Sequence, residues 1–231
     1  VGVVDTFMIS YAGEAAVSGV SLVNMFNTVF IFLFSALAAG GAVVVSQYIG
    51  SKNRSEGNMA AAQLMLVSVI FSVVIMIFVL IFNHPLLRLM FGRVENDVMS
   101  ACVTYLRISA YSYPALAIYN AGAAICRSMG KTNVTMYLSV IANGINMIGN
   151  AIGVFVLHAG VAGVAWPSFI ARTFSAAVIV VLCFKKKNTV YLEMKKIMQF
   201  SFTMQKKILS IAVPNGIENG LFQLAKVALS S

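Results

Sequence analysis

Residues 113–150, with the sequence YPALAIYNAGAAICRSMGKTNVTMYLSVIANGINMIGN, join two apolar segments of membrane-spanning length through one short basic turn. The turn carries Arg127 and Lys131, and the second segment places asparagines inside an otherwise apolar run. Polar side chains are costly at that depth in a membrane, so we treat them as candidate functional groups. The stretch therefore predicts two membrane helices, the second of which carries a polar feature.

The composition of the whole chain predicts the same environment. Of its 231 residues 60% are hydrophobic and 10% are charged, and the mean hydropathy is +0.89. A soluble domain is about half apolar and about a quarter charged. Because lipid cannot satisfy backbone hydrogen bonds, we expect an all-α polytopic membrane helical bundle. Apolar windows that can hold the ~20 residues of a spanning helix cover 22–48, 59–83, 101–125, 133–157 and 161–184, and two further apolar segments at 1–19 and 208–231 resemble partial spans.

The basic residues, which give a net charge of +9, are distributed among alternate loops. They do not form a basic face with interleaved aromatic side chains, which argues against a nucleic acid partner. Because they concentrate in the loops after even-numbered spans, the positive-inside rule predicts that these loops are cytoplasmic in a multi-pass protein of the cell membrane. The Lys-rich segment 185–207 also carries apolar residues, so an anionic-lipid anchor along the inner membrane surface is a second interpretation, and both can hold at once.

Loop lengths predict how the chain is divided. The loops between the first six predicted helices are short, whereas the segment at 185–207 is longer. We expect 1–184 to be an N-terminal transmembrane lobe of six helices, with the first helix truncated. Segment 185–207 is then a cytoplasmic linker, and 208–231 is the seventh helix, which starts a second lobe. Transporters built from two repeated halves have such a central connection, so the intact protein is expected to have about twelve spans.

Several motifs, in this order and spacing, resemble the multidrug and toxic compound extrusion family of secondary transporters. They are VDTFMISYAGEAAVSGVSL (4–22), AAGGAVVVSQYIGSKNRSEG (38–57), YLRISAYSYPALAIYNAGAAICRSMGKTNVTMY (105–137), NGINMIGN (143–150), GVAGVAWPSFIAR (160–172) and ILSIAVPNGIENGLFQLAKVALSS (208–231). The resemblance implies a protein of two six-helix lobes that alternates between inward and outward openings. It also implies export of drugs and other organic, often cationic compounds against entry of Na⁺ or H⁺, with no other cofactor. The partners would be membrane lipid and the second lobe of the same chain.

A set of polar residues in the predicted spans is the candidate cation site. Asp5 is a carboxylate in an apolar helix, and Asn143, Asn146 and Asn150 recur at helical spacing on one face. The resemblance places Asp5, Asn146, Asn150 and Ser168 at cation-binding positions, although some family members carry an acid in place of Asn150. Simpler interpretations stay open: hydration of Asp5 at the membrane surface, hydrogen bonds between helices for the asparagines, and a backbone hydrogen bond for Ser168.

Five further polar residues are candidates for lining a substrate cavity: Gln47, Tyr119, Asn120, Arg172 and Glu218. Tyrosine faces favour organic cations, and amides add hydrogen bonds. A charged side chain within a span needs a partner or water. For Arg172, an ion pair with Glu218 and a role in substrate binding or gating are both open.

The sequence carries no nucleophile elbow, phosphate-binding glycine loop or metal-hydrolase pattern, which indicates that the chain is not an enzyme. Two other functions are alternatives to an exporter. A lipid-linked oligosaccharide flippase would share the architecture and need a more cationic central cavity. A non-transporting membrane scaffold would use the polar residues only to hold helices together.

Overall fold

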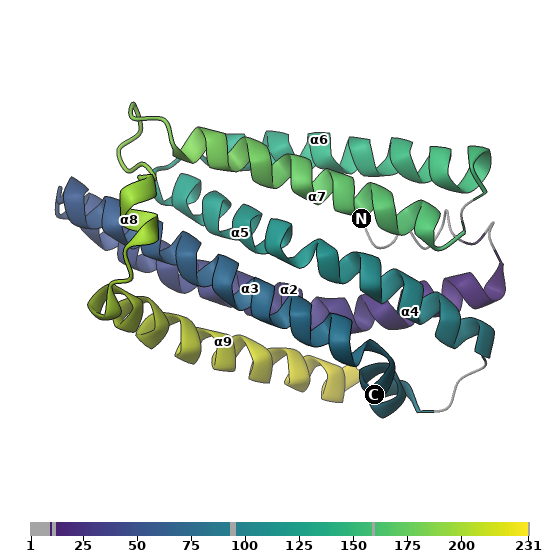
Figure 1. Ribbon diagram of the computed structural model, residues 1–231. Helices are drawn as coiled ribbons and strands as arrows, with labels where there is room; N and C mark the ends of the chain where they lie inside the picture. The colour runs from purple at the N-terminus through teal and green to yellow at the C-terminus, as the bar shows by residue number, and fades with distance from the viewer. Residues whose placement is uncertain (1–9, 11–12, 93–95, 159, 231) are drawn as a thin grey trace. The chain divides into compact units, whose positions relative to one another are not determined.

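The computed structural model describes residues 10, 13–92, 96–158 and 160–230, which form helices and connecting turns without a strand (Figure 1). The helices are α2 (Glu14–Gly50), α3 (Arg54–Phe91), α4 (Asn96–Tyr111), α5 (Tyr113–Ser128), α6 (Thr132–Ala151), η2 (Ile152–Val156), α7 (Ala162–Cys183), α8 (Met194–Met198) and α9 (Phe202–Ser230). Here η2 is a π-helical turn that continues α6. The prediction of an all-α protein is confirmed.

Four helical stretches in the described part of the chain are long and apolar enough to cross a membrane. They are Glu14–Gly50, Arg54–Leu89, Thr132–Val156 and Ala162–Cys183. Large apolar side chains are exposed along these helices, Met25, Ile81 and Ile148 among them, as expected for helices that face lipid rather than water. The chain is therefore a polytopic helical membrane protein.

Two predicted helix boundaries are wrong. The expected span at 101–125 is divided into α4 and α5, because the chain turns at Ser112, whose N–H donates to the carbonyl of Ser109 at 3.0 Å. Pro114 disfavours helical geometry in the residue before it and lacks an N–H, so a helix begins there more readily than it continues. In addition, α2 begins at Glu14, inside the predicted 1–19 segment, directly after Gly13 with a φ of 122°.

The described contacts group the chain into two compact units. Unit 1 comprises Val1–Val29, Ser72–Leu116 and Tyr137–Ser175, and unit 2 comprises Phe30–Phe71, Ala117–Met136 and Ala176–Ser231. Several helices, α2 and α3 among them, contribute residues to both units. This grouping cuts across helices, so the division into a lobe at 1–184, a linker at 185–207 and a seventh helix at 208–231 stays a prediction.

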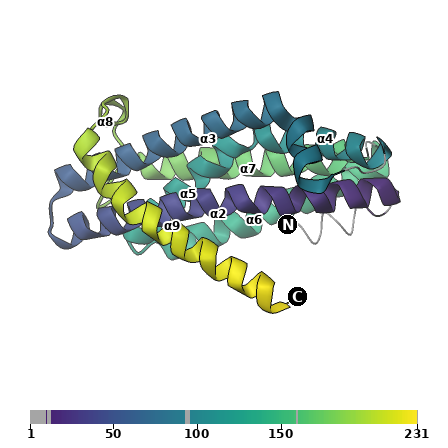
Figure 2. The same cartoon turned by 90° about the horizontal axis from the view of Figure 1, so that it is seen from below.

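Small residues allow close helix packing within unit 2. A Cβ on Gly41 of α2 would lie 2.4 Å from a methyl carbon of Leu64 in α3, and a Cβ on Gly40 would lie 2.5 Å from Cβ of Ala212 in α9. Figure 2 shows α9 crossing α2, as the second contact requires. In lipid, where apolar surface is not driven together by water, such close approach is what holds helices against one another.

Candidate functional site

The predicted cation-site residues of α6 and α7 lie together in unit 1. The Oγ atom of Ser168 lies 3.0 Å from Oδ1 of Asn146 and 3.1 Å from the carbonyl oxygen of Val164, and its hydroxyl can donate to either. Asn146, Asn150 and Ser168 are 2%, 0% and 8% exposed. Two amides one helical turn apart on α6 and one hydroxyl of α7 are thus buried, and the hydroxyl is hydrogen-bonded to the Asn146 amide.

The backbones of these two helices approach closely because glycines and a proline face one another. A Cβ on Gly149 would lie 2.7 Å from Cβ of Pro167, and a Cβ on Gly153 would lie 2.2 Å from the carbonyl oxygen of Gly163. Pro167 has no N–H, so the Gly163 carbonyl four residues earlier loses its usual helical donor. The Gly163 carbonyl therefore lies at the contact of the two helices without its usual helical hydrogen bond.

A π-helical turn follows Asn150 directly. It covers Ile152–Val156, and the N–H of Leu157 donates to the carbonyl of Ile152 at 3.0 Å, a separation of five residues. Such turns are rare and frequently occur at functional sites. The apolar periodicity does not predict this π-helical turn. Gly149 and Gly153, on either side of Asn150, have no side chain that would obstruct it.

Two of the predicted residues, Asp5 and Asn143, are not part of the buried group formed by Asn146, Asn150 and Ser168. Asp5 lies outside the described residues, so its place in the cation site stays a prediction. Asn143 is exposed, whereas Asn146 and Asn150 are buried, so the structure buries only part of the expected asparagine face.

The substrate-cavity candidates are divided between the units, so the structure does not test whether they line one cavity. Arg172 belongs to unit 1, where its Nη1 atom donates to Oγ of Ser112 at 2.7 Å. Glu218 belongs to unit 2 and is exposed, and its expected ion pair with Arg172 stays a prediction. Tyr119, also in unit 2, donates to the carbonyl of Thr135 at 3.4 Å.

Asn120 and Gln47 have different surroundings within unit 2. The Nδ2 atom of Asn120 is buried and has no hydrogen-bond partner within the described part of the chain. Gln47 is exposed and lines a cavity of ≈ 360 Å³ together with Tyr48 and Lys207. The Nζ atom of Lys207 donates to the Tyr48 hydroxyl at 2.6 Å, and this bond raises the pKa of Lys207.

Two asparagines of α2 that were not among the predicted site residues are hydrogen-bonded by tyrosines in unit 1. The hydroxyl of Tyr113 donates to Oδ1 of Asn27 at 2.5 Å, and that of Tyr105 donates to Oδ1 of Asn24 at 3.1 Å. Their spacing along an apolar helix is the same kind of signal that identified Asn143, so it could have found them. These bonds satisfy polar groups that would otherwise be costly in the membrane.

A pair of thiols was also missed. The Sγ atoms of Cys126 in α5 and Cys183 in α7 lie 3.9 Å apart, and both side chains are buried. Because the two residues are far apart in the sequence, spacing alone could not bring them together. Cys102 is buried elsewhere, in unit 1.

The fold and the buried amide pair define a polytopic membrane protein with polar groups at the contact of two spanning helices. Residues 1–152, which are more than half of the chain, match the MatE family model, so the chain belongs to the MatE family. The family resemblance drawn from the motifs is confirmed.

Individual relatives match nearly the whole chain. The uncharacterized transporter YisQ of Bacillus subtilis (strain 168) is 27% identical over 99% of this chain and 50% of its own length. The probable multidrug resistance protein NorM of Thermotoga maritima is 24% identical over 96% of this chain and 48% of its own length. The chain thus spans about half the length of these relatives.

Solved structures share the fold. A crystal structure of a MATE protein in the bent conformation superposes with a TM-score of 0.90 at 22% identity, and the match covers 98% of this chain and 50% of that chain. An outward-facing MATE family transporter of the MOP superfamily superposes with a TM-score of 0.85 at 22% identity, covering 97% of this chain and 51% of that chain. At this identity the likeness shows the fold of the chain alone.

Proposed function

We propose that the chain forms the first lobe of an antiporter that exports drugs and other organic, often cationic compounds, driven by entry of Na⁺ or H⁺. The observation that carries this proposal is the buried group of Asn146, Asn150 and Ser168 beside the π-helical turn. Membership of the MatE family and the similarity to NorM, a probable multidrug resistance protein, support it.

The donor set suits a small hard cation. Amide and hydroxyl oxygens are ligands that such cations accept, and Oδ1 of Asn146 and Oγ of Ser168 already lie 3.0 Å apart. An arriving Na⁺ would replace the Ser168 proton as the partner of the Asn146 oxygen. The hydroxyl could then turn its proton toward the Val164 carbonyl, which lies 3.1 Å away. Asp5 is proposed to supply the carboxylate that makes the site negative, or that carries the proton in the H⁺ case.

Cation binding can drive export only if it favours one conformation over the other. We propose that the helix contact at Asn146, Asn150 and Ser168 is arranged differently in the two states, with the adjoining π-helical turn absorbing the change. Because binding equilibria are reciprocally linked, a cation that favours one state must be bound less tightly when substrate favours the other.

Ethidium efflux from cells that carry the full-length gene tests this proposal. Efflux is measured under imposed Na⁺ or H⁺ gradients for wild type, Asn146→Ala and Ser168→Ala. The matched control is Asn143→Ala, which removes an exposed asparagine from the same helix. We expect gradient-driven efflux to fall at least about tenfold in the two site variants, because the loss of one polar contact worth about 1.4 kcal/mol weakens binding tenfold. Efflux should persist in the control.

The outcomes separate the competing functions. Efflux that responds to one gradient identifies the coupling ion. Equal efflux in all variants would place the cation site elsewhere. No efflux by the wild-type protein under either gradient would favour a lipid-linked oligosaccharide flippase or a membrane scaffold instead.

A further inference from the structure

The segment between α7 and α9 is fixed to the ends of other helices in unit 2. The Nη2 atom of Arg54, the first residue of α3, donates to the carbonyls of Lys186 and Asn188 at 2.8 and 3.0 Å. The guanidinium carbon of Arg54 also lies 4.7 Å from the centre of the Tyr191 ring. Lys131 donates to Oδ1 of Asn188 at 2.5 Å, so a second cation holds the same part of the segment.

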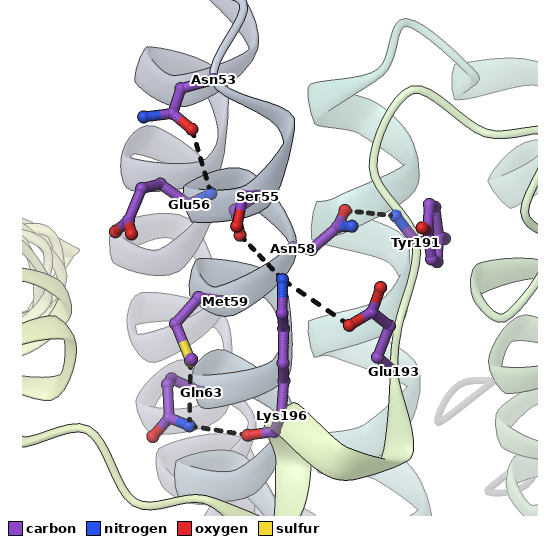
Figure 3. A network of polar contacts seen from close by, with 9 residues as sticks. All are labelled: Asn53, Ser55, Glu56, Asn58, Met59, Gln63, Tyr191, Glu193 and Lys196. Carbon is purple, nitrogen blue, oxygen red and sulfur yellow. Dashed lines mark hydrogen bonds and ion pairs between the residues drawn. The ribbon is translucent and has the colours of Figure 1, made fainter.

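A second group of contacts fixes the part of the segment that leads into α8 (Figure 3). The N–H of Tyr191 donates to Oδ1 of Asn58 at 3.0 Å, and Nζ of Lys196 donates to the carbonyl of Ser55 at 3.1 Å. The side chain of Gln63 donates to the carbonyl of Lys196 at 3.0 Å. These hydrogen bonds hold the segment in a defined position on the surface of unit 2.

This surface contains a cavity of ≈ 400 Å³ that is rich in cations. Its lining residues are Tyr48, Ile49, Lys52, Arg54, Lys187, Asn188, Thr189 and Val190. They supply two ammonium groups and a guanidinium, together with amide and hydroxyl groups, and among these described residues no carboxylate lines the cavity. Arg54 uses only Nη2 for its two backbone bonds, so its other N–H donors are left for a ligand.

The acidic residues closest in sequence to the lining residues, Glu56 and Glu193, do not themselves line the cavity. The carboxylate of Glu193 lies 3.6 Å from Nζ of Lys196, so it is already paired. Figure 3 shows the side chain of Glu56 directed away from Tyr191 and Lys196. The cavity therefore has the charge and the donors that suit a phosphate group.

Large apolar side chains that follow the cavity residues along the chain indicate which molecule carries that phosphate. Met194, Met198, Phe200 and Phe202 are 62%, 78%, 65% and 73% exposed. Exposed lysines lie beside these residues in the segment: Lys195 follows Met194, and Lys206 follows Phe202 by four residues. Exposed methionine and phenylalanine side chains mixed with lysines are typical of a segment that lies in the headgroup layer of a membrane.

We propose that the cavity lined by Lys52, Arg54 and Lys187 binds the phosphate headgroup of an anionic phospholipid. The exposed apolar side chains from Met194 to Phe202 would enter the adjoining layer of the same leaflet. Basic pockets at the ends of membrane helices recognise anionic headgroups in this way. The proposal concerns lipid binding alone and does not depend on the transported substrate.

Native mass spectrometry of the purified full-length protein in detergent tests the site. The protein is titrated with phosphatidylglycerol or with the neutral phosphatidylcholine, as wild type and as the double variant Lys52→Gln with Lys187→Gln. The matched control is Lys195→Gln with Lys206→Gln, which removes the same charge from the same surface outside the cavity. We expect wild type to prefer phosphatidylglycerol, and the cavity variant to bind it roughly tenfold more weakly than the control does.

Each other outcome would overturn the proposal. Equal loss in both double variants would mean diffuse attraction by surface charge. Equal affinity for the two lipids would exclude headgroup recognition. Competition by millimolar inorganic phosphate that is as strong as competition by phosphatidylglycerol would assign the cavity to a soluble phosphate. Thermal unfolding without lipid, at the same temperature in all three proteins, shows that the substitutions leave the fold intact.

Discussion

At the scale of single residues, polar groups that the membrane would penalise are paired with one another. Tyr113 with Asn27 and Ser168 with Asn146 show the pattern, because each pair joins two helices through a hydrogen bond inside apolar surroundings. The sequence identified Asn146 and Ser168 but could not show which helices meet. The thiol pair of Cys126 and Cys183 was missed for the same reason, since its distance is set by packing and not by spacing.

Oxidation should join those two thiols. Their Sγ atoms lie 3.9 Å apart and need to approach to the ~2 Å of a disulfide bond. We expect diamide or copper phenanthroline to remove two hydrogens and form the Cys126–Cys183 disulfide in wild type and in Cys102→Ser. The variant Cys126→Ser should form none. Alkylation after denaturation, followed by mass measurement, counts the free thiols. Alkylation of both Cys126 and Cys183 after oxidation of wild type, located by peptide mass, would contradict the prediction.

Two glycines of unit 1 should respond oppositely to the same substitution. A Cβ on Gly153 would lie 2.2 Å from a backbone oxygen, whereas a Cβ on Gly144 would meet nothing within 4 Å. We expect Gly153→Ala to destabilise the protein by about 1–3 kcal/mol through overpacking. Gly144→Ala should be neutral or stabilising by up to about 1 kcal/mol, because alanine favours a helix. Thermal unfolding in detergent measures both, and equal shifts would contradict the packing described for Gly153.

At the scale of elements, the length of the apolar windows predicted the membrane helices well. It did not predict where those helices are interrupted. The windows at 133–157 and 161–184 correspond closely to α6 with η2 and to α7. The window at 101–125 is instead two helices, because local backbone chemistry at Ser112 and Pro114 outweighs apolar continuity. Likewise, the π-helical turn after Asn150 depends on how glycines pack against the neighbouring helix, which no periodicity encodes.

The segment between α7 and α9 should lose its attachment when Arg54 becomes lysine. Lysine has one ammonium and no planar fork, so it cannot hold two carbonyls and cover the Tyr191 ring as the guanidinium does. We expect Arg54→Lys to accelerate trypsin cleavage after Lys185, Lys186 and Lys187 by roughly tenfold, since hydrogen bonds by charged groups contribute about 1.5–3 kcal/mol.

Arg127→Lys is the control for this experiment, because Arg127 is also basic and exposed and none of the hydrogen bonds described above involves it. Cleavage sites are assigned by mass spectrometry of the first fragments. Equal cleavage rates in wild type and Arg54→Lys would show that the segment is held mainly by its other contacts, such as those of Asn58 and Gln63.

At the scale of the whole molecule, composition and motifs were enough to predict a helical membrane protein of the MatE family. The family model and the solved relatives confirm this, although the chain spans about half the length of those relatives. Orientation in the membrane is a property of the loops and not of the packing, so it stays a prediction from the distribution of basic residues.

Cysteine labelling tests that orientation. In a background with Cys102, Cys126 and Cys183 replaced by serine, Lys187→Cys should react with a membrane-impermeant maleimide only after the cells are opened. Asn96→Cys, an exposed position at the start of α4, should react in intact cells. The positive-inside rule sets this expectation. The reverse labelling pattern would invert the predicted topology, and with it the side on which segment 185–207 meets lipid.

The hydrogen bonds of Gln63 have a mechanical consequence. Gln63 of α3 accepts from the N–H of Ser201, and Gln205 in the first turns of α9 donates to the backbone carbonyl and Oε1 of Gln63, each at 3.0 Å. These bonds fix the start of α9 to α3. Pro214 lies beyond these contacts and removes one backbone hydrogen bond of the helix, so any bending of α9 relative to α3 is expected at this residue.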